Sequence, residues 1–217
     1  MKIKLFKIGL IIFLSILLAG CTFIFQKGRR SDVQKIEELS QQLDELTRAK
    51  KVLESALSKE IEDRQVKLEM MEKGLVITVV GDVLFDSGKA KVRPESFPIL
   101  DKVATVLTEN VPELNVGIEG HTDNLPIKFS GWKSNWELST ARALSVLHYL
   151  VEEKSISPER VSAIGYGEYS LVASNSNKEG RQLNRRVEIV ILPQFTKAEE
   201  AKKIKETGLK EPAENLK

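Results

Sequence analysis

The sequence predicts an α+β protein: a two-layer domain with the element order β-α-β-α-β-β, preceded by a long helical segment. Three observations lead to this prediction. Residues 31–73 contain neither proline nor glycine and repeat leucine at heptad spacing. From residue 75 onward, short β-branched runs alternate with two amphipathic stretches. These runs extend over residues 75–193, and a segment of this length can bury a hydrophobic core.

The segment 31–73 has the pattern of a coiled coil. Its a and d positions are apolar apart from Lys50, and the pattern then shifts by four residues, which is typical of a stutter; the apolar residues are Ile36, Leu39, Leu43, Leu46, Leu53 and Leu57, then Ile61, Leu68 and Met71. We interpret the segment as a helical spacer that forms a homo-oligomer and ends at Gly74. The alternative is a single amphipathic helix that lies on another surface.

The elements of the domain follow from changes in periodicity. Pro94 suits the first turn of a helix, and Ser134 with Glu137 forms a capping box that opens a second helix. The predicted elements, in chain order, are a strand at 75–80, a helix at 94–109, a strand at 114–119, a helix from 134 to about 153, and strands at 161–165 and 186–192. We expect residues 194–217 to form a charged tail, either a weak helix or disordered.

Composition narrows the functional classes. The 217 residues include 33 Lys and Arg against 31 Asp and Glu, a formal net charge of +2. No domain-scale basic excess is available for nucleic acid, so we expect no nucleic-acid partner. One cysteine, Cys21, rules out an intramolecular disulfide, and two histidines offer little for a histidine metal cluster. We expect no cofactor and no metal.

The first 20 residues have the pattern of a secretory signal. Basic residues precede an apolar run from Ile8 to Ala19, and the run ends in Leu18-Ala19-Gly20-Cys21. This ending resembles a bacterial lipobox, which implies cleavage before Cys21 and acylation of its thiol, with residues 21–30 as a tether. The alternative is a retained membrane helix, because the 18 residues from Ile8 to Phe25 carry no charge and could span a bilayer.

Two polar groups of the domain are candidates for a binding site. Gly120-His121-Thr122-Asp123-Asn124 follows a strand, at the mouth of the predicted sheet. On the next helix, Asn135, Leu138, Ser139 and Arg142 lie near one line, because residues seven apart nearly eclipse after two turns. We expect Arg142 to aim an exposed guanidinium at the mouth.

An aspartate and an arginine that face one cavity suit a zwitterion. The carboxylate of Asp123 would hold an ammonium, and the guanidinium of Arg142 would clamp a carboxylate through two hydrogen bonds. A ligand with both groups on one carbon, the end of an amino acid, fits this arrangement. The alternative for Asp123 is that it only caps the turn after its strand.

Other chemistry finds weaker support. The spacing of His121 and Asp123 nominally suits a metal, but two ligands without a third make a poor site. Ser139 lacks a nucleophile-elbow motif, so no hydrolase is assembled and we expect no enzymatic activity. Trp132 and Trp136 could stack on sugar rings, although packing of their loop onto the domain is the simpler role.

Five motifs in order resemble the OmpA C-terminal family. They cover residues 75–193 and comprise Phe85-Asp86-Ser87-Gly88, Gly120-His121-Thr122-Asp123, Leu138-Ser139-Thr140-Ala141-Arg142-Ala143, Gly165-Tyr166-Gly167-Glu168 and Asn184-Arg185-Arg186-Val187-Glu188-Ile189. The longer loop 124–133 with its tryptophan is similar instead to the MotB type of the family.

The resemblance implies non-covalent binding of peptidoglycan. The family's aspartate and arginine, which hold the meso-diaminopimelate of the peptide stem, match Asp123 and Arg142. The residues that match positions lining the groove are Asn135, Leu138, Phe85, Asp86, Thr122 and Arg185, of which Arg185 is the weaker match. The expected protein is a lipoprotein on the periplasmic face of the outer membrane, tethering outer-membrane lipid to the cell wall through acylated Cys21. The alternative is an inner-membrane-anchored, non-lipidated accessory protein of a secretion or motor-type complex.

Overall fold

The computed structural model describes residues 33, 35–127 and 131–193. The chain divides into two units, Met1–Gln42 and Leu43–Lys217. In the first unit residues 35–42 are helical, and in the second the helix residues are 43–56. The predicted signal segment, Cys21 and the tail 194–217 lie outside the described residues. Among the described residues, no helix is both long and apolar enough to span a membrane.

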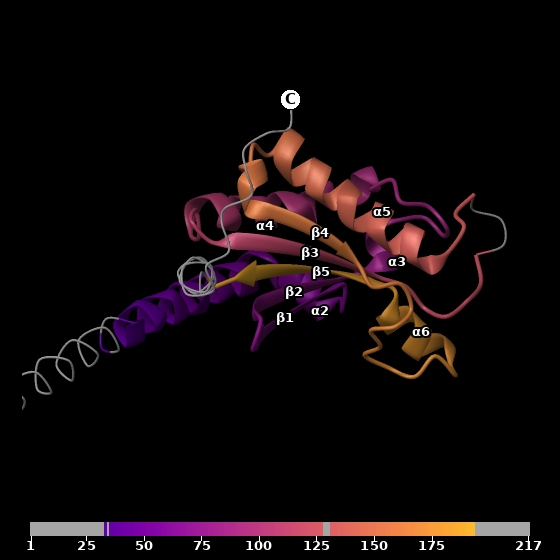
Figure 1. Cartoon of the computed structure of the whole chain (residues 1–217), viewed down its shortest axis with the longest axis horizontal. Coiled ribbons are helices and arrows are strands. Elements are labelled where there is room, and N and C mark those ends of the chain that lie inside the picture. Colours follow the sequence, from indigo (N-terminus) through magenta and orange to yellow (C-terminus); the bar gives the residue numbers. More distant parts are fainter. Residues whose placement is uncertain (1–32, 34, 128–130, 194–217) are drawn as a thin grey trace, which may run out of the picture. The chain divides into compact units, whose positions relative to one another are not determined.

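The second unit is built on one five-stranded sheet. The strands are β1 (Val66–Met71), β2 (Gly74–Val80), β3 (Asn115–His121), β4 (Val161–Gly165) and β5 (Arg186–Leu192). Their order in the sheet is β1-β2-β5-β3-β4, and only β3 and β4 run parallel. The sheet therefore places the last strand, β5, between β2 and β3 (Figure 1).

The two predicted long helices both form and cover one face of this sheet. They are α4 (Phe97–Glu109), with a short turn at Pro94–Ser96 before it, and α5 (Asn135–His148), which continues as a wider turn over Tyr149–Glu153. Figure 1 shows both on the same side of the strands. Shorter helices are α2 (Ser58–Glu62), α3 (Gly81–Leu84), the turn Pro158–Arg160 and α6 (Lys178–Asn184). The predicted α+β class is confirmed, and the predicted strands and long helices occur in the expected order; β1, α3 and α6 are additions to that order.

Alternation along the strands separates two faces of the sheet. Ile77, Ile189 and Ile118 lie side by side in register, are fully buried and belong to the hydrophobic core with α4 and α5. One residue further along, the row Thr78, Glu188 and Glu119 points to the other face. The apolar face thus anchors the helices, and the opposite face carries buried charge.

The predicted 31–73 helix is too long in its second half. Helical residues end at 56, α2 adds one short piece, and residues 66–71 form edge strand β1, which pairs with β2. Arg64 breaks the helix with a left-handed φ of 58°, and Gly74, predicted to end the helix, instead begins β2 with a φ of 126°. No glycine or proline marks the end of this helix in the sequence. The four-residue shift in the apolar spacing, which indicated a stutter, coincides with the end of the helix.

The leucine stripe of the helix packs within its own chain. Leu46, Ala49, Leu53 and Leu57 are 0 to 3% exposed and join the domain core. The alternative of an amphipathic helix that lies on another surface therefore describes residues 46–57. Leu43, which continues the same a/d pattern toward the amino terminus, is 56% exposed.

Replacing Leu53 with alanine tests this packing. The substitution leaves a cavity in the domain core, and we expect a loss of about 2–5 kcal/mol in the free energy of unfolding, measured by urea denaturation of the full chain. The matched control is Leu43→Ala, which we expect to change that free energy by less than about 0.5 kcal/mol because its side chain is exposed. Equal effects of the two substitutions would contradict the intrachain role.

Candidate functional site

A cavity of about 920 Å³ opens where the end of β3, the start of α5 and the loop after α3 meet. All eight residues that the sequence predicted for the groove line it: Phe85, Asp86, Thr122, Asp123, Asn135, Leu138, Arg142 and Arg185. Asp82, Lys89 and Arg93 also line it and were not predicted. The structure therefore brings the predicted residues together from segments up to 100 residues apart, including Phe85 and Arg185.

Close backbone contact fixes α5 against the end of β3. A Cβ on Gly120 would lie only 2.0 Å from the Ser139 carbonyl oxygen, so this position accepts no side chain. Ser134 caps α5 by accepting a hydrogen bond from the Glu137 amide, as the capping box predicted. The contact places the first turns of α5 beside the loop that carries Asp123.

Arg142 is buried in the wall of the cavity and not exposed as predicted. Its side chain is 5% exposed, and its Nε donates a hydrogen bond to the Lys89 carbonyl at 3.0 Å. The guanidinium lies 5.0 Å from the centre of the Phe85 ring, in cation–π contact. The loop after α3 folds over the side chain, and no sequence pattern indicated that long-range contact.

Burial changes the charge state of Arg142 little. It lowers the pKa of the guanidinium to about 10, with Asp82 and Asp123 raising it and Arg185 lowering it. The group is therefore a cation at neutral pH. Its neighbours at hydrogen-bond distance are main-chain carbonyls, so its charge has no carboxylate in direct contact among the described residues. Such a desolvated cation favours an anionic ligand group.

Asp123 serves both the turn and an ion pair. Its Oδ1 accepts a hydrogen bond from the Leu125 amide at 3.1 Å, the turn-capping role that the sequence left open. Its Oδ2 accepts one from Arg185 at 2.7 Å. The carboxylate is 6% exposed and lines the cavity, so the capping role does not remove it from the site.

Arg185 connects two carboxylates at the cavity. Its Nε and one terminal nitrogen donate to the two oxygens of Asp82 at 3.0 and 2.7 Å, and the other nitrogen reaches Asp123. The hydrogen bonds to Asp82, followed by those to Asp123, raise the pKa of Arg185 against the effect of burial. Arg185 is thus a firmly charged partner of Asp123.

Asn135 joins the separate segments at the cavity rim. Its Nδ2 donates to the Glu168 carboxylate at 2.6 Å and lies 3.3 Å from the carbonyl oxygens of Asp123 and Leu125. Leu138, one turn further along α5, is 5% exposed and supplies apolar lining. These contacts hold the loop of Asp123 on α5.

Local contacts show structural roles for Ser139 and Trp132. The Ser139 hydroxyl accepts a hydrogen bond from the Gly167 amide and donates to the Trp136 carbonyl, so it holds backbone segments together. Trp132 donates its Nε1 hydrogen to the Gly88 carbonyl at 2.9 Å, which supports the packing role of its loop. Trp136 stacks on Tyr169 and is 48% exposed.

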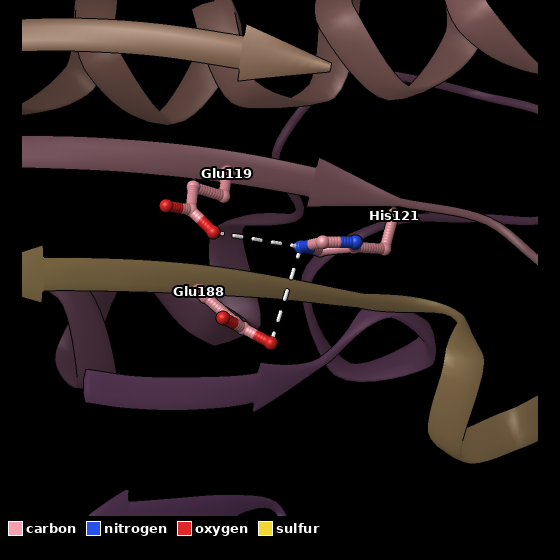
Figure 2. A group of neighbouring side chains, drawn as sticks. All are labelled: Glu119, His121 and Glu188. Atoms are coloured by element: carbon pink, nitrogen blue, oxygen red, sulfur yellow. Dashed lines mark ion pairs between the residues drawn. The ribbon is translucent and has the colours of Figure 1, made fainter. Parts of the chain in front are cut away.

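His121 does not share a site with Asp123. It is 1% exposed and turns toward Glu119 and Glu188 (Figure 2). Its ring stacks on Tyr166. Burial lowers the pKa of His121 to about 4, with Arg186 and Lys73 adding to the effect and Glu188 opposing it. The spacing of His121 and Asp123 therefore gave no metal pair, and the neighbours of His121 come instead from its own strand and from β5.

Comparison with known proteins identifies the family to which the domain is similar. Residues 84–185 match the OmpA family. The chain is 40% identical to motility protein B of Bacillus subtilis over 165 residues, which are 76% of this chain and 59% of that protein. It is 39% identical to outer membrane porin F of Pseudomonas aeruginosa over 113 residues, 52% of this chain and 31% of the porin. The chain thus spans less than two thirds of either relative.

Solved structures agree with the fold. The cell wall anchor of the T6SS from Pseudomonas aeruginosa superposes with a TM-score of 0.60 at 37% identity, over 65% of this chain and 97% of the other. A putative MotB-like protein from Desulfovibrio vulgaris gives a TM-score of 0.65 at 25% identity, over 71% and 95% of the two chains. By its sequence match, its sheet and these likenesses, the chain belongs to the OmpA family.

Proposed function

We propose that the chain binds peptidoglycan non-covalently through the cavity that Asp123 and Arg142 line. The observation that carries this proposal is the placement of both groups, with opposite charges, in one cavity of an OmpA-family domain. A zwitterionic carbon, as at the end of a diaminopimelate side chain in the peptide stem, offers an ammonium to Asp123 and a carboxylate to Arg142. A solved structure of similar fold is named as a cell wall anchor, which supports the proposal.

Because Arg142 is buried, it contributes more than Asp123 to the selectivity between diaminopimelate and lysine stems. Among the described residues, the hydrogen bonds of its guanidinium go to carbonyl oxygens, and the Phe85 ring lies in cation–π contact with it. A ligand carboxylate would therefore add an anionic contact at hydrogen-bond distance that these residues do not supply. A lysine side chain in the stem has the ammonium but lacks this carboxylate. The site should therefore prefer diaminopimelate-type stems, since a lysine would leave Arg142 buried without an anion.

The hydrogen bonds of Arg185 to Asp82 allow a ligand ammonium to replace Arg185 as the partner of Asp123. A ligand ammonium can take over Oδ2 of Asp123 while Arg185 keeps both hydrogen bonds to Asp82. The cost of separating Asp123 from Arg185 is thereby reduced, because Arg185 retains a charged partner. In this role Arg185 positions Asp123 before binding and is not itself required to touch the ligand.

Lipid anchoring at Cys21 is the first proposed arrangement of the chain in the envelope. Acylation of that thiol would fix residues 21–30 to the outer membrane and let the domain reach the wall from its periplasmic face, without enzymatic activity. One acyl chain binds only marginally, so stable anchoring needs the fully acylated cysteine. An oligomer through the amino-terminal part of 31–73, where Ile36 and Leu43 are exposed, would add avidity.

A second arrangement is favoured by the likeness to motility protein B. That likeness covers 76% of the chain and so extends beyond the OmpA-family domain itself. In this arrangement the apolar segment Ile8–Phe25 stays in the inner membrane, and the chain is a non-lipidated peptidoglycan-binding accessory protein of a secretion or motor-type complex. Both arrangements use the same cavity and differ only in the anchor.

Substitutions at the charge pair test the proposed binding. We expect Asp123→Asn and Arg142→Gln each to reduce retention of the chain on diaminopimelate-type sacculi by about tenfold or more, measured by co-sedimentation, because each removes one charge-assisted contact. Asp123→Asn preserves the shape of the side chain, Arg142→Gln shortens it, and thermal unfolding checks that the fold persists in both variants. Asp63→Asn, in an exposed turn, is the matched control and should bind as the parent chain does. Retention of both cavity variants at the parent level would refute the site.

The anchor is decided by mass spectrometry of the mature amino terminus. Lipid anchoring predicts a chain that begins at Cys21 and carries acyl chains, because the lipobox directs cleavage before an acylated cysteine. An intact chain from Met1, without acyl mass, would support the inner-membrane arrangement instead. A Cys21→Ser variant is the control, since the first arrangement predicts that it loses the acyl mass.

A further inference from the structure

The face of the sheet opposite the helices holds a buried cluster that the cell-wall cavity does not use. Glu119 and His121 are two residues apart on β3, so they point to the same face, and Glu188 lies directly opposite Glu119 on β5. All three are less than 9% exposed. Figure 2 shows the imidazole of His121 directed between the two carboxylates.

His121 is the unexplained member of this cluster. Neither ring nitrogen has a hydrogen-bond partner among the described residues, although the side chain is 1% exposed. Its Nε2 lies 3.9 Å from Glu119 Oε2 and 3.9 Å from Glu188 Oε1, beyond hydrogen-bond distance. Leaving a buried imidazole unpaired is costly, so a ligand that accepts its lone pair would account for the arrangement.

The spacing of the three groups suits a small metal ion. One ligand atom from each of Glu119, His121 and Glu188 can be chosen so that all lie within 4.8 Å of one another. Around tetrahedral zinc, with bonds of about 2.1 Å, ligand atoms lie about 3.4 Å apart. The gaps of 3.9 Å from His121 would therefore need to close by about half an ångström, and the gap between the two carboxylate oxygens, which is at most 4.8 Å, by no more than about 1.4 Å.

Lys73 occupies the cluster from the solvent side. It lies in the turn between β1 and β2, and its Nζ is 2.7 Å from Oε2 of Glu119 and 2.7 Å from Oε2 of Glu188. Its side chain is 36% exposed, so the ammonium can move into solvent without opening the core. Lys73 is thus a cation that competes with a metal for both carboxylates.

Arg186 would remain hydrogen-bonded to Glu188 when that carboxylate ligates a metal ion. Its Nε donates to Glu188 Oε1 at 2.6 Å, and its terminal nitrogens also reach the Ser170 carbonyl. A hydrogen bond of this kind orients a carboxylate that ligates a metal. Replacing the Lys73 ammonium by a divalent ion adds one positive charge beside Arg186. This repulsion weakens metal binding, and the need to displace Lys73 from both carboxylates weakens it further.

We propose that Glu119, His121 and Glu188 form a three-ligand site for a divalent transition-metal ion such as Zn²⁺, for which Lys73 competes. Imidazole with carboxylates is a ligand set that zinc accepts, and a fourth position remains for water. The site lies on the side of the sheet away from α4 and α5 and does not depend on the proposed binding of peptidoglycan.

The competition gives a test with an unusual sign. Titration of the full chain with ZnCl₂ by calorimetry should show that Lys73→Met binds one zinc ion at this site at least about tenfold more tightly than the parent chain does, because the competing charge is gone. Adding His121→Phe, which keeps a ring to stack on Tyr166, should abolish that binding. His148→Phe, in the exposed part of α5, is the matched control and should leave it unchanged.

Two results would overturn the inference. The first is that Lys73→Met binds zinc no more tightly than the parent chain. The second is that the Lys73→Met, His121→Phe double variant retains the tighter-bound ion. Circular dichroism identifies variants that do not fold, and Lys73→Gln replaces Lys73→Met if the latter is one of them. Adventitious zinc at other residues is recognised because it survives His121→Phe and is present in every variant.

Discussion

The cavity depends on one steric constraint, the contact of the α5 backbone with the end of β3. Gly120 has no room for a side chain because the Ser139 carbonyl lies against it, and the Ser139 hydroxyl holds the Gly167 amide on the other side. This contact fixes how far the loop after β3 lies from the first turns of α5. Asp123 belongs to the loop and Arg142 to the helix, so their common cavity follows from it.

The two arginines that line the cavity differ in the groups that surround their charges. Arg142 is held among carbonyl oxygens and the Phe85 ring, which leaves its charge available to a ligand. Arg185 is neutralised by Asp82 and Asp123 and serves to hold the second of these in place. Two residues of the same type in one cavity thus have different capacities, because in the described part of the chain Arg185 has carboxylate partners and the hydrogen bonds of Arg142 go to carbonyl oxygens.

The sequence was informative wherever a local pattern determined the structure. Strands 161–165 and 186–192 have the predicted bounds, because β-branched runs of that length have few alternatives. The capping box at Ser134 also formed, since it needs only residues three apart, Ser134 and Glu137. Edge strand β1 was missed because Leu68 and Met71 extend the leucine spacing of the helix, and only pairing with β2 gives them a different structure. Asp123 and Arg142 were candidates from their places after a strand and along a helix, whereas the remaining groove residues came mainly from resemblance to a family. The burial of Arg142 and the role of Asp82 depend on contacts between distant segments.

The most direct test of the account is a structure of the chain bound to a stem peptide that ends in meso-diaminopimelate. The account predicts that the ligand carboxylate lies at hydrogen-bond distance from the Arg142 guanidinium and its ammonium from Asp123, with Arg185 still paired to Asp82. A peptide bound outside the cavity, or one that leaves Arg142 in contact with carbonyl oxygens alone, would contradict it.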